Sequence, residues 1–219
     1  YLHRAGGFLS EFISLDAPRL QEVLIKEPEV PRAITCWHLP KSVRFVTGTP
    51  GTLLHLRNWA RVTSLTISKC SRNGHACAQM AALINIPGVF PQLKHFACME
   101  PKVSAEIDFD GLAGLDALSI ATETELKGTP SANERVSVTC TGSSGWDLPI
   151  AKATCVCIHQ VPGVVRLPGE CMTFQYNGHL IGAAEALRGH RSAAEEAVRA
   201  GKDVVRLKIG DPFVFGRGG

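Results

Sequence analysis

The residues best suited to ligand chemistry lie near the end of the chain, in a loop formed by Gly210, Asp211 and Pro212. They follow residues 204–207, a mainly apolar run that is typical of a buried strand. A glycine lets the backbone approach a ligand closely because it has no Cβ, and a proline stiffens the loop by fixing φ. The Asp211 carboxylate adds a negative charge beside that backbone, which suits a ligand with a cationic group.

The surrounding segment reads AVRAGKDVVRLKIGDPFVFGRGG over residues 197–219. Residues 193–219 resemble the uroporphyrinogen-III C-methyltransferases of the tetrapyrrole methylase family. Members of that family carry a helix ending in Ala-Gly-Lys, a Val-Val-Arg-Leu-Lys strand, a Gly-Gly-Asp-Pro loop and the run Phe-Val-Phe-Gly-Arg-Gly-Gly. The resemblance implies that S-adenosylmethionine binds against Gly210, Asp211 and Pro212, with Asp211 facing its sulfonium or amine. It also implies that Arg217 pairs with a substrate carboxylate, and that the reaction is C-methylation of uroporphyrinogen III in porphyrin biosynthesis.

The segment departs from the family pattern at Ile209, which replaces the first loop glycine. The glycine-rich loop near the start of the family's domain has no counterpart in this sequence, and neither has the family's substrate domain. We therefore expect residues 179–219 to form a helix-strand-loop fragment, an incomplete methylase segment that binds the cofactor weakly or not at all. A tetrapyrrole substrate is expected only where the methylase domain is complete.

Other reactive residues give weaker signals. The eight histidines form neither an HExxH nor a His-x-His cluster, and Ser143-Ser144-Gly145 lacks the glycine-flanked elbow of a hydrolase. The run Asp108-Phe109-Asp110-Gly111 predicts a turn, since the remaining ligands of a calcium loop are missing.

Three of the eight cysteines, Cys98, Cys155 and Cys157, lie within apolar, strand-like runs. A free cysteine in such a run behaves as a small buried hydrophobe, although the even count also permits disulfides. Cys155-Val-Cys157 is too closely spaced for the Cys-x-x-Cys pair of a zinc site. Reduced thiols predict a cytoplasmic protein.

A short template recurs through most of the chain, with apolar residues at positions one, four and six. Its central position recurs mostly every 18 to 22 residues, and the one longer step of 31 residues contains an alanine-rich stretch, 75–86, that favours a helix. The predicted strand centres are Val23, Val43, Leu65, Phe96, Leu118, Val136, Val156 and Phe174.

A fixed period of about 20 residues is typical of stacked repeats, in which each unit buries its apolar face only against its neighbours. Residues 18–178 resemble leucine-rich repeats, and the closest copy, residues 62–70, ends with Cys70 where such repeats place Asn or Cys. The resemblance implies a protein partner bound on the open face, where Thr66 is expected to lie. The alternative is an ordinary β-rich domain with evenly spaced strands.

The predicted fold is therefore α/β: a leucine-rich-repeat-like solenoid of short parallel strands over residues 1–178, followed by the methylase fragment over 179–219. In that fragment, residues 181–200 are expected to be helical because they are rich in Ala, Glu and Arg. Charged residues make up 20% of the chain and the net charge is +3, without a basic run, which argues against nucleic-acid binding. No apolar run approaches the length of a membrane-spanning helix.

Overall fold

The computed structural model describes residues 18–25, 37–70, 74–140, 146–159, 163–176 and 199. The chain divides into two compact units, Tyr1–Gln175 and Tyr176–Gly219. Nearly all of the described residues belong to the first unit, so the fold below is that of the first unit. The expected helices within 181–200 and the strand at 204–207 lie outside the described residues, apart from Arg199, which is helical.

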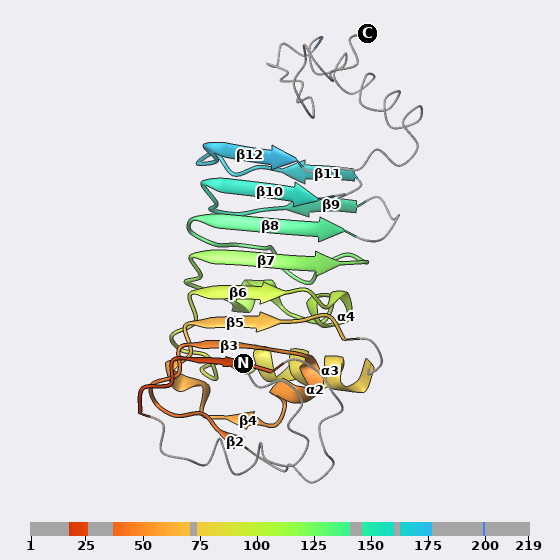
Figure 1. The fold of residues 1–219 in the computed structure, drawn as a ribbon. Coiled ribbons are helices and arrows are strands. Elements are labelled where there is room, and N and C mark those ends of the chain that lie inside the picture. The colour runs from red at the N-terminus through yellow and green to blue at the C-terminus, as the bar shows by residue number, and fades with distance from the viewer. Residues whose placement is uncertain are drawn as a thin grey trace, which may run out of the picture. The chain divides into compact units, whose positions relative to one another are not determined.

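The first unit is an α/β structure built on a parallel sheet (Figure 1). Among the described residues, eight strands form this sheet in the order β1-β3-β5-β6-β7-β8-β10-β12. The strands are β1 (Glu22–Leu24), β3 (Phe45–Gly48), β5 (Ser64–Ile67), β6 (His95–Cys98), β7 (Ala117–Thr122), β8 (Arg135–Cys140), β10 (Cys155–His159) and β12 (Thr173–Tyr176). Each pairing from β1 to β10 is parallel.

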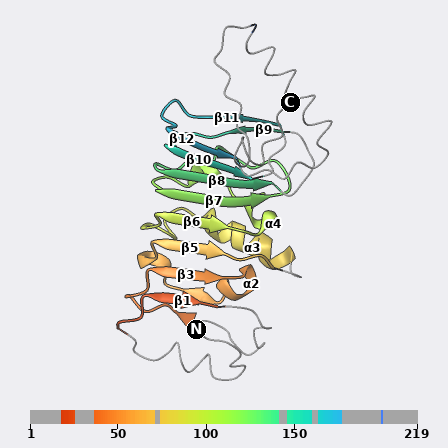
Figure 2. The ribbon, with the colours of Figure 1, turned by 45° about the horizontal axis from the view of Figure 1, so that its top comes forward.

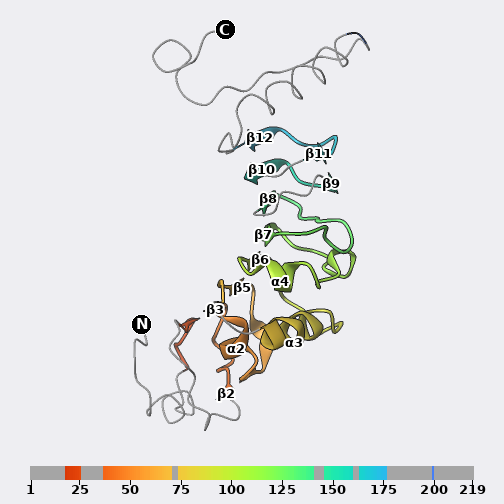
Figure 3. The same ribbon diagram turned by 90° about the vertical axis from the view of Figure 1, so that its right-hand side faces the viewer.

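Short elements on the return side connect these strands. Two further parallel pairs lie there, β2 (Trp37–His38) with β4 (Leu56–Arg57), and β9 (Trp146–Pro149) with β11 (Gly163–Arg166). The helical segments are α2 (Pro50–Leu53), η1 (Trp59–Arg61), α3 (Gly74–Ile84), α4 (Pro101–Ser104) and η2 (Phe109–Gly111). Figures 1 and 3 place α2, α3 and α4 on the same side of the sheet.

The strands of the sheet lie one above another (Figure 2), and the strand pairings align the same positions of each strand from β1 to β10. The paired row through the strand centres contains Val23, Val46, Leu65, Phe96, Leu118, Val136 and Val156. All seven side chains are buried, with at most 5% of their surface exposed. Burial of each such side chain contributes about 1.5–3 kcal/mol, so this row forms the main apolar core.

Seven of the eight predicted strand centres coincide with observed strands, but the prediction for Val43 was wrong. Val46, not Val43, pairs with both Val23 and Leu65. Val43 is buried just before β3, so it occupies the first position of the template. The error arose because the apolar Phe45 stands two residues after Val43, at the spacing of positions four and six of the template, whereas the Phe45 side chain is 46% exposed.

The register correction gives Gly48 a specific role. Gly48 pairs with Ile67 in the second buried row, which continues through Cys98, Ile120, Val138 and Ile158. A Cβ on Gly48 would lie 2.8 Å from Thr52 Oγ1 and 3.1 Å from Leu53 Cδ2. The Leu53 side chain of α2, which is completely buried, therefore fills the space that a strand side chain fills in the other units.

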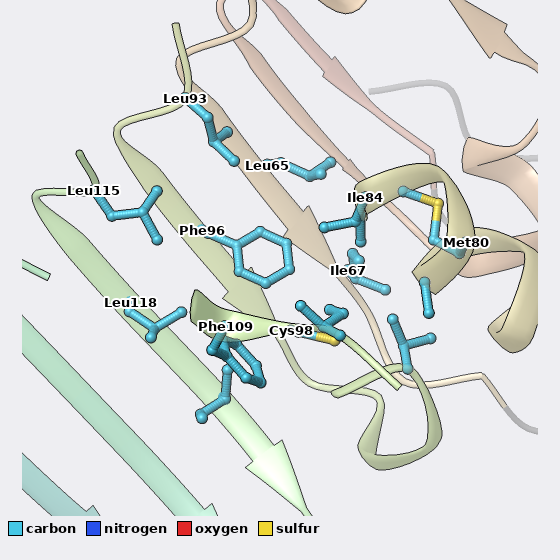
Figure 4. Packing of buried hydrophobic residues seen from close by; sticks show 14 of the residues in the cluster. Leu65, Ile67, Met80, Ile84, Leu93, Phe96, Cys98, Phe109, Leu115 and Leu118 are labelled. Atoms are coloured by element: carbon cyan, nitrogen blue, oxygen red, sulfur yellow. The ribbon is translucent and has the colours of Figure 1, made fainter. Parts of the chain in front are cut away.

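The alanine-rich stretch predicted to be helical forms α3, so that prediction is confirmed. Its buried residues recur on one helical face: Ala76, Cys77, Met80, Ala81 and Ile84. Figure 4 shows Met80 and Ile84 near the labelled core residues of β5 and β6. The helix replaces a short return segment, which explains the longer step between β5 and β6.

Candidate functional site

The loop residues singled out by sequence, Gly210, Asp211, Pro212 and Arg217, lie outside the described residues, as does Ser143-Ser144-Gly145. The structure therefore neither brings the predicted cofactor and substrate residues together nor separates them. The site that can be built from the described residues is on the sheet.

The sheet face opposite the buried rows carries two rows of outward side chains, because successive residues of a strand point to opposite faces. The first row passes through Phe45, Ser64, His95, Ala117 and Arg135. The second row passes through Thr47, Thr66, Ala97, Ser119 and Ser137. Each of these ten residues is exposed or half-buried, so the two rows form an accessible surface, called the open face below.

The open face is hollowed across β5 to β8. The hollow measures about 280 Å³ and is lined by Ser64, His95, Phe96, Ala97, Ala117, Leu118, Ser119, Arg135 and Ser137. Small side chains form its floor, which lets another chain approach the sheet closely. Its volume is below the roughly 300–1,000 Å³ of small-molecule sites, so the hollow suits one inserted side chain better than a cofactor.

Two exposed side chains, the imidazole of His95 and the guanidinium of Arg135, border this floor. The register places Ala117 between His95 and Arg135 on adjacent strands. Strands are spaced about 4.8 Å apart, so the backbones of His95 and Arg135 are roughly 10 Å apart across Ala117. Within the described part of the chain, neither side chain has a hydrogen bond or an ion pair to another side chain. Both are therefore available to a partner.

Next to Arg135 lies the acidic residue Asp116, whose carboxylate is already engaged. The Asp116 carboxylate lies 4.0 Å from Lys94 Nζ and 3.5 Å from Asn133 Nδ2, which donates to it. The backbone N–H groups of Glu134 and Arg135 both donate to the Asp116 carbonyl at 3.0 Å. These bonds fix the start of β8 and hence the position from which Arg135 projects.

A cysteine–histidine pair lies farther along the sheet, on β10. Cys157 Sγ and His159 Nε2 are 3.2 Å apart. Thiol–imidazole pairs can provide nucleophilic catalysis, but the Cys157 side chain is only 2% exposed and a substrate could not reach its sulfur. The pair therefore acts in packing.

The predicted burial of thiols is confirmed for Cys98 and Cys157, whereas Cys155 is half-buried. Burial raises the pKa of Cys98 to about 11 and that of Cys77 to about 11, with a smaller contribution from the nearby Glu100 carboxylate. Thiols with such pKa values are poor nucleophiles at neutral pH. Cys77, Cys98, Cys155 and Cys171 are free thiols.

Glu100 is 4% exposed, and it is held by backbone donors. Its Oε2 accepts a hydrogen bond from the Cys70 N–H at 2.7 Å, and its Oε1 accepts one from the Lys102 N–H at 3.4 Å. The second bond caps the N-terminus of α4, where a carboxylate is favoured. Glu100 therefore links the ends of β5 and β6 and has a structural role.

The turn predicted from Asp108 to Gly111 is confirmed, since these residues form a turn around η2. Asp108 Oδ1 accepts a bond from the Asp110 N–H at 3.1 Å, and Asp110 Oδ1 accepts one from the Thr129 N–H at 2.9 Å. Both carboxylates thus stabilise backbone. Among the residues that the structure describes, no three His, Cys, Asp or Glu side chains lie close enough to hold a metal ion.

Comparisons of the chain with protein-family models, with curated proteins and with solved structures found no match. In the described ranges, no helix has the length and apolar character needed to cross a membrane. Sequence reasoning placed Thr66 on the open face but missed His95 and Arg135. Their signal was present, since both occupy the position directly before a central buried residue of the template.

Proposed function

We propose that residues 18–178 form a leucine-rich-repeat-like solenoid that binds another protein on the open face. The observation that carries this proposal is the pair of aligned outward rows, whose small and polar side chains surround the hollow at Ala97, Ala117 and Ser119. The sheet face is accessible, and its small side chains let another chain come close to the strands. Such a face suits a protein surface or an extended peptide better than a small molecule.

The strand topology supports the repeat interpretation. Neighbours in the sheet follow the order of the chain, so each strand pairs with the sheet strands that come directly before and after it in sequence. The hydrogen bonds at the strand starts also repeat. The Arg44 carbonyl accepts bonds from the N–H groups of Thr63 and Ser64, and the Lys94 carbonyl accepts bonds from those of Asp116 and Ala117. Units that contact only their neighbours in this way characterise repeat proteins.

An enzymatic role for the sheet is less well supported. Its Cys157 thiol is inaccessible, and the carboxylates of Glu100, Asp108 and Asp110 accept backbone hydrogen bonds. S-adenosylmethionine-dependent methylation of uroporphyrinogen III remains a second proposal, which rests only on the resemblance of residues 193–219.

The proposed function can be tested by selecting binders from a display library of random 12-residue peptides on the full chain. Ser119→Trp fills the hollow without changing the charge, and it should abolish binding of the selected peptides. Ala82→Trp adds a similar bulk at an exposed position of α3 and should leave binding unchanged. If Ser119→Trp binds the peptides as well as the unmodified chain does, then the open face is not the interaction surface.

A further inference from the structure

We propose that the open face selects partner segments that carry an acidic side chain, and that Arg135 binds this carboxylate over the Ala117–Ser119 floor of the hollow. This inference rests on the proposed function, because it specifies the chemistry of a partner that the open face would bind.

The distribution of charge on the open face favours an acidic group. Along the two outward rows from β3 to β8, Arg135 is the one side chain with a full charge, among the residues that the structure describes. The acidic residue of the first row, Glu22, lies on β1 at the other end of the sheet. A guanidinium stays protonated at all physiological pH values, so this part of the open face is positive.

The surroundings of Arg135 leave its guanidinium free to bind. Its side chain is exposed. Asp116, directly before the adjacent strand β7, is engaged by Lys94 and Asn133. An arginine presents several N–H donors in one plane, which matches the two oxygens of a carboxylate. No side chain of the described residues uses these donors.

The floor beside Arg135 determines where the partner's carboxylate lies. Ala117 and Ser119 are small, and Ser137 follows Arg135 on the same face of β8. A short Asp or Glu side chain entering here reaches the guanidinium and meets the hydroxyl groups of Ser119 and Ser137. His95 borders the other side of Ala117 and supplies a further ring nitrogen.

A protein segment fits these features better than a nucleic acid does. Nucleic-acid binding requires several cationic groups along a path, because affinity grows with the number of phosphates neutralised. The hollow has one arginine, and the net charge of the chain is only +3.

The test is a selection from the same random 12-residue peptide library, carried out on the full chain and on three variants. The unmodified chain should enrich peptides with Asp or Glu at one aligned position. Arg135→Gln should lower the affinity for those peptides about five- to tenfold, the loss of roughly one charge-assisted hydrogen-bonded pair. Arg135→Glu should replace the acidic preference by a preference for Lys or Arg. Arg61→Gln, which removes an equal charge from an exposed position of η1, should retain the acidic preference.

The outcomes separate the two proposals. Suppose that Ser119→Trp abolishes peptide binding, but the selected peptides show no preference for Asp or Glu, or Arg135→Gln retains that preference. The open face then binds peptides, and the proposed role of Arg135 is wrong. If Ser119→Trp has no effect, or no peptide is enriched, the proposed function fails and this inference fails with it. Binding of a single-stranded oligonucleotide in place of acidic peptides would also overturn the inference.

Discussion

Gly48 offers a direct test of the corrected register, because its neighbours in the second buried row carry larger side chains. A Cβ at this position would lie 2.8 Å from Thr52 Oγ1 and 3.1 Å from Leu53 Cδ2. Thr52 is 4% exposed, and its hydroxyl donates to the Thr49 carbonyl at 2.9 Å. Because Thr52 is β-branched and hydrogen-bonded, it cannot easily move aside.

We therefore expect Gly48→Ala to lower the free energy of unfolding by about 1–3 kcal/mol, the usual cost of overpacking. Leu53→Ala should lower it by about 2–5 kcal/mol, because the side chain is completely buried and its removal leaves a cavity. The variant that carries both Gly48→Ala and Leu53→Ala should be more stable, by about 0.5–1.5 kcal/mol, than the sum of the two single losses in the free energy of unfolding predicts. The alanine methyl then enters space that Leu53 has left, and residues in contact are coupled to this extent.

Urea unfolding followed by circular dichroism measures all three free energies. Gly51→Ala is the matched control, since a Cβ there meets no atom within 4 Å and the residue lies in α2. It should be neutral or stabilising by up to about 1 kcal/mol. A neutral Gly48→Ala variant with strictly additive effects would refute the argument that Leu53 occupies the place of a strand side chain.

Three further predictions concern other parts of the chain. Gly128→Ala should destabilise the fold by at least about 1–2 kcal/mol in urea unfolding, because φ is +75° and a Cβ would lie 2.7 Å from a backbone nitrogen, whereas Gly88→Ala, with φ +80° but open space, should cost less. Burial raises the pKa of the Cys98 thiol to about 11 from 9.0. The contribution of the protonated thiol to the free energy of unfolding is therefore present below pH 9 and should be lost as the pH rises from 9 to 11. A Cys98→Ala variant whose free energy of unfolding decreases by the same amount over this pH range would contradict this prediction. Calorimetric titration of the full chain with S-adenosylhomocysteine should give weak or no binding, because a single loop offers only a few hydrogen bonds of about 0.5–1.5 kcal/mol each; micromolar binding that is abolished by Asp211→Ala would show a more complete site than the sequence indicates.

The strand positions were predictable because each unit buries apolar residues at the same positions of the template. Leu65, Phe96 and Leu118 are each followed two residues later by another buried apolar residue, and they form one paired row. The prediction failed at Val43 because the apolar Phe45 has the residue type of a core position although its side chain is exposed. Gly48 lies in the second buried row but has no apolar side chain that would mark it in the sequence. Sequence patterns record side-chain type, and neither the outward direction of Phe45 nor the filling of a gap by Leu53 is visible in them.

The site was less predictable than the fold. The strongest motif, residues 197–219, directed attention to Gly210 and Asp211, which lie outside the described residues. The surface features of the sheet arise from residues far apart in the sequence, such as His95 and Arg135, which the register brings to opposite sides of Ala117. Their proximity becomes apparent only when the register is known, because a shift of β8 by one residue would point the Arg135 side chain toward the core.

The two faces of the sheet place different demands on the sequence, and this difference makes the role of Arg135 testable apart from folding. Inward residues such as Phe96 and Leu118 must fill a close-packed core, where a change of one methylene group alters stability. Outward residues lack such neighbours, and substitutions at exposed positions usually change stability by less than about 0.5 kcal/mol. Arg135→Glu should therefore leave the urea midpoint nearly unchanged while it reverses the charge preference of the selected peptides. A variant that lost stability along with selectivity would place Arg135 among the structural residues instead.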